Sequence, residues 1–273
     1  MSAARKKRRV MVTGAGSPIG EQLVRNLLDD SRVGHILAVS GYSTDSFPLE
    51  SSKRLTIAQV DMIKSRSVHN LLFETAKDLD INVVIHTAMH ASAMDEGAKV
   101  HAYNVDSVRN LINLCERHPS IERFVLRSAS AVYQVQRDLP VLIGEDHPLN
   151  MSGQAPQWVR DRVEADLTAC VRMGLGTLEI LVLRMAEVLA PGTGSQLYDY
   201  LQSPVCFHPA GFDPMINLMS IDDAVDALRS AIHANEQGVF NIPGADTLPV
   251  SVCIQRWGRI GIPAFDSFES SFF

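Results

Sequence analysis

The sequence predicts an α/β fold in which a doubly wound parallel sheet carries a small C-terminal lobe. Short β-branched or apolar runs alternate with longer segments whose apolar residues recur three and four positions apart, which is the pattern of βαβ units. The first apolar run leads directly into a glycine-rich turn that opens a helix. The 273 residues, of which 46% are hydrophobic, can bury one sizeable core and leave little for a second, so we expect one globular unit.

The alternating part of the chain covers residues 10–192 and follows a basic tail at 1–9. Each predicted strand is a short apolar run, and each predicted helix has one apolar face. The strands are predicted at 10–13, 35–40, 55–60, 82–87, 123–128 and 178–183, and the helices between them at 20–28, 65–79, 98–116 and 157–173.

The regular alternation of apolar runs and helical segments ends after Pro191. Residues 193–273 are predicted to form the small lobe together with elements that return to the core. This part is too short for a roomy lobe. We expect a short segment at 195–201, a loop rich in Pro and Gly through Pro214, a strand at 216–220, a helix at 221–234, a strand at 238–242 and a helix at 250–259.

Charge and cysteine content exclude several functional classes. A net charge of −6 and a pI near 5.8 argue against a protein that binds nucleic-acid phosphates. The four cysteines form no C-x-x-C pair, so we expect free thiols in a reducing cytoplasm rather than a zinc site or disulfides. No apolar stretch approaches the length of a membrane span. The basic run at 5–9 fits a solvated tail, with a contact to anionic lipid or a partner as the alternative.

The glycine-rich turn at 13–20, Thr-Gly-Ala-Gly-Ser-Pro-Ile-Gly, lies between the first strand and the first helix. Such a turn directs backbone N–H groups and the positive end of the helix at a pyrophosphate, and its last glycine lets the helix pack closely on the strand. We therefore predict dinucleotide binding; the alternative is a purely structural turn. The tip of the second strand, from Ala38 to Tyr42, has neither the acid expected for NAD nor a cation for NADP. Lys53 and Arg54 are the nearest candidate cations, so the choice of NAD or NADP stays open.

Further motifs follow in a fixed order: Gln-Val-Asp-Met at 59–62, Val-Ile-His-Thr-Ala-Met at 84–89, Asn104-Val105, Ser-Ala-Ser-Ala-Val-Tyr at 128–133 and Leu183-Arg184. Together with the glycine turn they resemble the extended short-chain dehydrogenase/reductase family, the NAD-dependent epimerase/dehydratase group. In the family's T-G-x-x-G-x-x-G loop, a serine here replaces the middle glycine. The resemblance implies a Rossmann-type fold with a substrate lobe and NAD or NADP as cofactor. It places cofactor contacts at Gly14, Ser17, Pro18, Ile19, Gly20, Ser40, Asp61, Met62, Thr87, Ala88, Met89 and Arg162.

The family's chemistry rests on a Tyr and a Lys four residues apart on one helix and on a Ser or Thr at the end of the fifth strand. At the matching positions this chain has Trp158, Arg162 and Ala129, the last flanked by Ser128 and Ser130. An indole N–H donates a hydrogen bond but does not shuttle protons, whereas a guanidinium keeps the positive charge. The resemblance therefore implies an altered site that retains binding, and Ser128 and Ser130 remain candidate replacements.

Three other groups have two interpretations each. His86, His90 and His101 suggest a metal site, but no carboxylate or thiol completes the set at ligand spacing. Asp222-Asp223 resembles a carboxylate pair, yet its position after Ser220 predicts a helix start. The run at 145–147, Glu-Asp-His, is predicted to lie in an exposed turn without chemistry.

Three functional hypotheses remain. The first is a dinucleotide-binding pseudoenzyme with a sensing or scaffold role. The second is an active oxidoreductase or epimerase that acts on a nucleotide-linked small molecule through an atypical acid/base, and the third is a structural subunit that binds no nucleotide. The family resemblance also implies a homodimer formed through the helices at 98–116 and 157–173, which carry apolar residues on more than one face.

Overall fold

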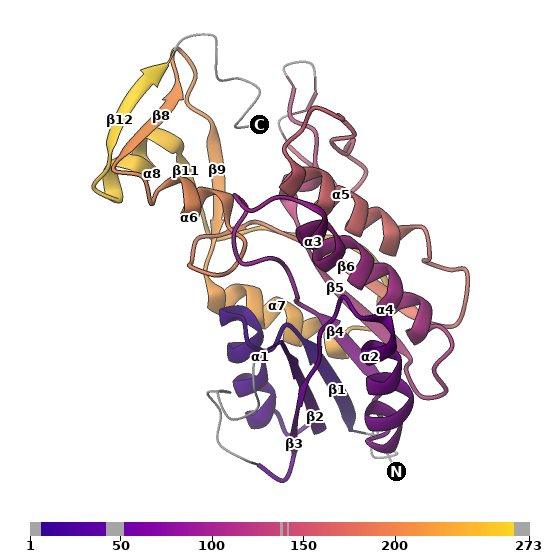
Figure 1. Cartoon of the computed structure of the whole chain (residues 1–273). Helices are drawn as coiled ribbons and strands as arrows, with labels where there is room; N and C mark the ends of the chain where they lie inside the picture. The colour runs from indigo at the N-terminus through magenta and orange to yellow at the C-terminus, as the bar shows by residue number, and fades with distance from the viewer. Residues whose placement is uncertain (1–6, 42–51, 137–138, 141, 265–273) are drawn as a thin grey trace.

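A computed structural model describes residues 7–41, 52–136, 139–140 and 142–264. Its centre is a sheet of seven parallel strands in the order β10-β6-β5-β4-β1-β2-β3, so the predicted Rossmann-type fold is confirmed (Figure 1). The strands are β1 (Arg8–Thr13), β2 (Val33–Ser40), β3 (Leu55–Gln59), β4 (Val83–His86), β5 (Arg123–Ala129), β6 (Glu179–Met185) and β10 (Gly238–Ile242).

The chain winds outward from β1 through β2 to β3 and then crosses back to β4, which pairs with the other side of β1. The strand order therefore reverses between β1 and β4. In open α/β sheets, ligands bind outside the carboxyl ends of the strands at such a point.

Helices cover both faces of the sheet (Figure 1). One face packs on α1 (Pro18–Asp29) and α7 (Ile221–His233), and the other on α2 (Ser65–Asn70), α3 (Ala98–His101), α4 (Ser107–Cys115) and α5 (Gln157–Cys170). Successive residues of a strand point to opposite faces, so Val10 and Val12 join the first core while Met11 joins the second.

Two of the predicted helices change their winding along their length. The helix predicted at 65–79 continues from α2 into a π-helical segment, Leu71–Ala76. The helix predicted at 98–116 runs through α3, the π-helical segment Ala102–Asp106 and α4. The spacing of apolar residues predicted the positions of both helices, but it did not predict the π-helical segments inside them.

The C-terminal lobe contains two small sheets and lies beyond the carboxyl ends of the large sheet (Figure 1). The prediction of a continuous loop through Pro214 was wrong, because Val205–Pro209 forms a strand paired with Ile260–Ala264. Since the partner strand lies more than 50 residues further along the chain, local patterns do not reveal the pairing. The lobe comprises β7 (Glu187–Val188), α6 (Gln196–Tyr200), β8 (Val205–Pro209), β9 (Met215–Met219), β11 (Asp246–Pro249), α8 (Val250–Arg256) and β12 (Ile260–Ala264).

Ser220 caps α7, as its position predicts. Its Oγ atom accepts a hydrogen bond from the Asp223 N–H at 3.0 Å and donates to the Asp223 carboxylate at 2.8 Å. Asp222 and Asp223 lie in the first helical turn, where carboxylates interact favourably with the helix dipole. The helix-start interpretation of this acid pair is confirmed.

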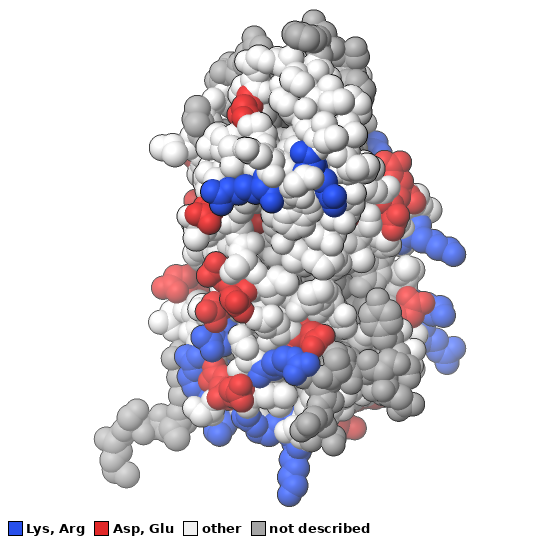
Figure 2. Space-filling view, turned by 90° about the vertical axis from the view of Figure 1, so that its left-hand side faces the viewer, with Lys and Arg blue, Asp and Glu red and all other residues white. Residues whose placement is uncertain are grey.

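The charged side chains on the surface are consistent with the net charge of −6. On the face shown in Figure 2, acidic and basic side chains are interspersed, and the described residues form no extended basic patch there. All four cysteines are free. Within the described ranges, no helix has the length and apolar character needed to cross a bilayer.

Candidate functional site

The predicted cofactor residues gather at the carboxyl edge of the sheet, around the switch point between β1 and β4. The turn after β1 approaches the backbone after β4 closely: a Cβ atom on Gly14 would lie 2.6 Å from the Ala88 nitrogen and 2.9 Å from the Thr87 Oγ1. Gly14 also has a φ of +72°, a conformation that only glycine adopts readily. The first glycine of the loop is therefore required on two independent grounds.

Ser17 has a clear structural role at the position where the family has its middle glycine. It is the N-cap of α1: its Oγ accepts from the Gly20 N–H at 3.2 Å and donates to the Gly14 carbonyl at 2.8 Å. Pro18 follows in the first turn, where its missing N–H costs nothing. The substitution thus keeps the strand–turn–helix geometry.

The other predicted cofactor residues, except Arg162 on α5, lie at three strand ends. Thr87 is held on β1 because its Oγ1 donates to the Thr13 carbonyl at 2.8 Å. Ser40 ends β2 and is buried. Asp61 follows β3, where its Oδ1 accepts from the Ile63 N–H at 3.1 Å, and Met62 beside it is buried. The strand order brings all of these ends to one edge of the sheet.

The candidate cations for a 2′-phosphate lie at the wrong end of the sheet. Arg54 donates to the carbonyls of Val33 at 2.8 Å and Asp30 at 3.3 Å, both at the amino end of β2. Lys53 directly precedes it in the chain. The suggestion that these residues recognise the 2′-phosphate is wrong for Arg54, whose guanidinium lies away from the carboxyl end at Ser40. The second-strand tip beyond Gly41 lies outside the described residues.

On α5, the positions of the family's Tyr and Lys form a cation–π pair. Trp158 and Arg162 are four residues apart on one helix face, and the guanidinium carbon lies 4.8 Å from the centre of the indole ring. Arg162 is 9% exposed and donates a hydrogen bond to the Gly194 carbonyl. Its guanidinium therefore holds the loop that follows β7 against α5.

The two serines beside Ala129 lie in different surroundings. The Ser128 Oγ donates to the Asp166 carboxylate at 2.6 Å, and Ser130 is exposed at the start of a 3-10 turn, Ser130–Val132. Asp166 in turn accepts from Arg184 at 2.7 and 3.0 Å. Sequence reasoning missed this buried network, because it joins α5 to two strands that only the fold makes neighbours.

Two small cavities lie between β5, α5 and the loop after β7. Their volumes are about 20 and 10 Å³. Arg127 and Arg162 line both cavities, and Ala129 and Glu187 line the second. Neither Arg127 on β5 nor Glu187 on β7 belongs to one of the motifs in the sequence, and only the fold brings the two residues to one cavity.

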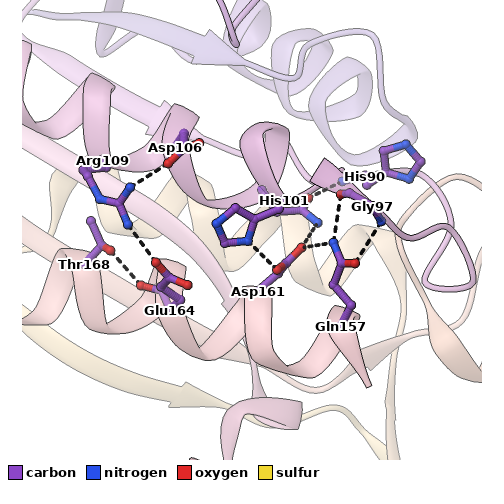
Figure 3. A network of polar contacts seen from close by, with 10 residues as sticks. His90, Gly97, His101, Asp106, Arg109, Gln157, Asp161, Glu164 and Thr168 are labelled. Carbon is purple, nitrogen blue, oxygen red and sulfur yellow. Dashed lines mark hydrogen bonds and ion pairs between the residues drawn. The ribbon is translucent and has the colours of Figure 1, made fainter. Parts of the chain in front are cut away.

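A second polar network joins α3 and the π-helical segment after it to α5 (Figure 3). The buried Asp161 accepts from the His101 Nδ1 at 2.8 Å and from the Asn104 and Gln157 amides at 3.3 Å each. Gln157 also exchanges two hydrogen bonds with the Gly97 backbone. The hydrogen bond to Asp161 raises the pKa of His101 above its usual value, and the charges of Asp161, Glu164 and Asp106 act in the same direction.

This geometry predicts a pH-dependent contribution to stability. Because the pKa of His101 is raised on folding, its stabilising contact is fully present below about pH 6.5 and is lost as the pH rises through the folded-state value. We expect the stability gap between the wild type and His101→Gln, measured by urea unfolding, to be larger at pH 6 than at pH 9. The matched variant His69→Gln removes an exposed histidine that makes no ion pair among the described residues, and it controls for the loss of an imidazole ring. If the difference in stability between the wild type and His101→Gln were equal at pH 6 and pH 9, it would contradict a raised pKa of His101 in the folded protein.

The three histidines at 86, 90 and 101 do not converge. His86 is fully buried, its Nδ1 lies 2.7 Å from the Thr13 Oγ1, and burial lowers its pKa to about 4. Within the described part of the chain, no group of three His, Cys, Asp or Glu side chains is placed to hold a metal ion. The run at 145–147 also diverges: Glu145 and Asp146 are exposed, whereas His147 turns inward and donates to the Gln134 carbonyl.

Comparison with known proteins shows which family shares this architecture. The model of the NAD dependent epimerase/dehydratase family matches residues 10–197. An uncharacterized protein of Mycobacterium tuberculosis is 28% identical over 263 residues, which cover 93% of this chain and 67% of that protein.

Solved structures share the fold at low sequence identity. A dTDP-glucose 4,6-dehydratase from Bacillus anthracis in complex with NAD has a TM-score of 0.73 and 17% identity, over 95% of this chain and 85% of that one. A UDP-glucuronic acid 4-epimerase mutant from Bacillus cereus, in complex with a fluorinated UDP-sugar and NAD, has a TM-score of 0.71 and 18% identity, over 94% and 85%. Since the family model covers well over half of the residues, the chain belongs to the NAD dependent epimerase/dehydratase family.

Proposed function

We propose that this protein binds a dinucleotide at the turn after β1 and carries out no proton transfer at the usual family position. The observation that carries the proposal is the combination of an intact strand–turn–helix geometry at Gly14–Gly20 with Trp158 and Arg162 on α5. The first turn of α1 presents N–H groups without intrahelical acceptors, and Ser17 satisfies only that of Gly20. The N–H of Ile19 is then available to the pyrophosphate.

The residues at the strand ends fit the adenosine half of the cofactor. Asp61 and Met62 would contact the adenine, and Ser40 would lie beside the ribose. We favour NAD over NADP because the sequence holds no Lys or Arg from Gly41 to Ser52 and because Arg54 is bound at the opposite end of β2. When bound, the dinucleotide would supply hydride transfer, but the chain offers no matching acid or base on α5.

Proton transfer is the step that this site lacks. The indole of Trp158 does not exchange a proton near neutral pH, and Ala129 has no hydroxyl to orient a substrate oxygen. The loss of a positioned general acid/base costs about 10²- to 10⁴-fold in rate. The protein is therefore expected to act through binding, as a sensor of the dinucleotide or as a scaffold.

The proposal is tested by calorimetric titration with NAD and NADP together with a turnover assay on nucleotide sugars. We expect NAD to bind more tightly than NADP, with no product formed from dTDP-glucose or UDP-glucuronic acid. The double variant Trp158→Tyr/Arg162→Lys is expected to keep NAD binding. Rapid turnover by the wild-type protein would refute the non-catalytic role, and absence of any dinucleotide binding would refute the binding role.

One observation favours a second candidate function, an active oxidoreductase or epimerase with an atypical acid/base. Glu187 lines the second cavity beside Ala129 and Arg162. However, its Oε1 already accepts from the Ser195 Oγ at 2.5 Å and the Leu197 N–H at 3.1 Å. If turnover is found, Glu187→Gln distinguishes this candidate, since it would abolish activity while NAD binding persists.

A homodimer through α3, α4 and α5 remains a prediction from the family. The apolar residues that suggested a second buried surface lie in the chain's own core: Val105, Val108 and Leu111 are at most 1% exposed. They carry no argument for a dimer. Sedimentation of the full chain tests the assembly state directly.

A further inference from the structure

Two arginines line the same two cavities, and neither contacts a carboxylate of the described residues. Arg127 comes from β5 and Arg162 from α5, and both line the two cavities of about 20 and 10 Å³. The Arg127 Nη2 donates to the Thr193 carbonyl at 2.8 Å, and the Arg162 Nη2 donates to the Gly194 carbonyl. Two adjacent peptide carbonyls of one loop thus hold the two guanidinium groups.

Most of the N–H groups of this pair have no protein acceptor. A guanidinium presents five N–H donors in a planar fork, and within the described residues each of these two makes a single hydrogen bond. The Arg127 Nε is shielded from solvent and has no hydrogen-bond partner at all. An unsatisfied buried donor costs about 1–3 kcal/mol, so the arrangement favours a ligand that supplies acceptor oxygens.

Nearby carboxylates are engaged elsewhere. In the part of the chain that is described, no carboxylate oxygen lies within 4.0 Å of either guanidinium. Asp161 is held by His101, Asp166 by Arg184, and Glu187 by Ser195. Burial, and secondarily the charge of Arg162, lowers the pKa of Arg127 to about 10, so both groups remain cations at neutral pH.

We propose that Arg127 and Arg162 form an anion site that binds the carboxylate group of a small-molecule ligand. A planar carboxylate accepts the paired N–H groups of a guanidinium fork through its two oxygens. The negative charge of Glu187 in the second cavity disfavours a dianion.

This site lies beside the predicted cofactor contacts Ala88 and Met89, which line the first cavity, and one loop connects it to the dinucleotide turn. Gly192 lies against Pro18 at the start of α1, where an added Cβ would be 3.5 Å from the proline Cδ. Thr193 and Gly194, the next two residues, carry the carbonyls that hold the arginines. The anion site does not depend on the proposed dinucleotide binding and is testable without it.

Calorimetric titration and thermal unfolding of the full chain with sodium acetate test the proposal. Sodium chloride at equal ionic strength controls for screening, and sodium phosphate tests the alternative oxyanion. We expect acetate to bind and to raise the melting temperature above the chloride control, and phosphate to bind more weakly. A melting temperature that follows only ionic strength, or tighter binding of phosphate, would overturn the assignment.

Variants locate the site. Arg127→Met keeps the aliphatic bulk without the charge and is expected to weaken acetate binding at least tenfold. Arg127→Lys keeps the charge without the fork, and its affinity for acetate is expected to lie between those of Arg127→Met and the wild type. Arg25→Met, which removes an exposed guanidinium on α1, is the matched control and is expected to bind acetate like the wild type. Unchanged affinity in both Arg127 variants would refute the site, and a parallel NAD titration reports separately on the dinucleotide turn.

Discussion

Replacing Asp166 with Asn is expected to lower the free energy of unfolding by about 3–5 kcal/mol, the usual cost of breaking a buried ion pair. The Asp166 carboxylate is fully buried and accepts two hydrogen bonds from Arg184 and one from Ser128. The substitution removes the charge but leaves the Arg184 guanidinium at 4% exposure, where water does not replace the lost partner. Urea unfolding of the two proteins measures the difference.

Two further variants make this test specific. Asp106→Asn breaks an exposed ion pair with Arg109 on the surface of the same helical layer, and is expected to cost at most about 1 kcal/mol. The double variant Asp166→Leu/Arg184→Met removes both charges and is expected to recover more than half of the loss, since Tyr133 still donates to Asn241 at 2.6 Å. An Asp166→Asn protein as stable as Asp106→Asn would show that the pair contributes little.

Gly20→Ala is expected to disrupt the turn and to lower dinucleotide affinity at least tenfold. A Cβ atom there would lie 2.1 Å from the Gly14 carbonyl oxygen and 2.8 Å from the Ala15 Cα, both backbone atoms that cannot move aside as a side chain does. Forced overpacking of this kind costs about 1–3 kcal/mol. Thermal unfolding and NAD titration of the same sample measure both effects.

Gly153→Ala is the matched control, because nothing lies within 4 Å of the added methyl group. It is expected to change stability by less than about 0.5 kcal/mol and to leave NAD binding intact. If Gly20→Ala binds NAD as the wild type does, the turn after β1 is not the dinucleotide site.

The sheet and the cofactor edge could be predicted from sequence because their signals are local. The alternation of apolar runs and helical spacing located all seven parallel strands within a few residues. The Ser17–Pro18 pair after β1 is a local helix-start signal, and the parallel order then brings Asp61 and Thr87 to the same edge as Gly14. Spacing alone also placed Trp158 and Arg162 on one face of α5.

The features that sequence reasoning missed depend on contacts between distant segments. Arg127 faces Arg162 only because β5 ends beside α5, and both reach the loop at 193–194 only because β5 pairs with β6. The pairing of β8 with β12 also joins segments that are far apart in the sequence. Arg54 contacts the amino end of β2 and not the carboxyl end, where a 2′-phosphate would lie. A charged residue within an apolar run gives no sign of which partner the fold will bring to it.

Thermal unfolding of the full chain with NAD tests directly whether this protein binds the dinucleotide. At about 100 times its Kd, a ligand adds roughly 2.7 kcal/mol of stability, which corresponds to several degrees in melting temperature for a chain of this size. We expect such a shift with NAD, a smaller shift with NADP and a smaller shift for NAD with Gly20→Ala. The absence of any shift with either dinucleotide at millimolar concentration would contradict dinucleotide binding and would leave a family fold retained for its surfaces.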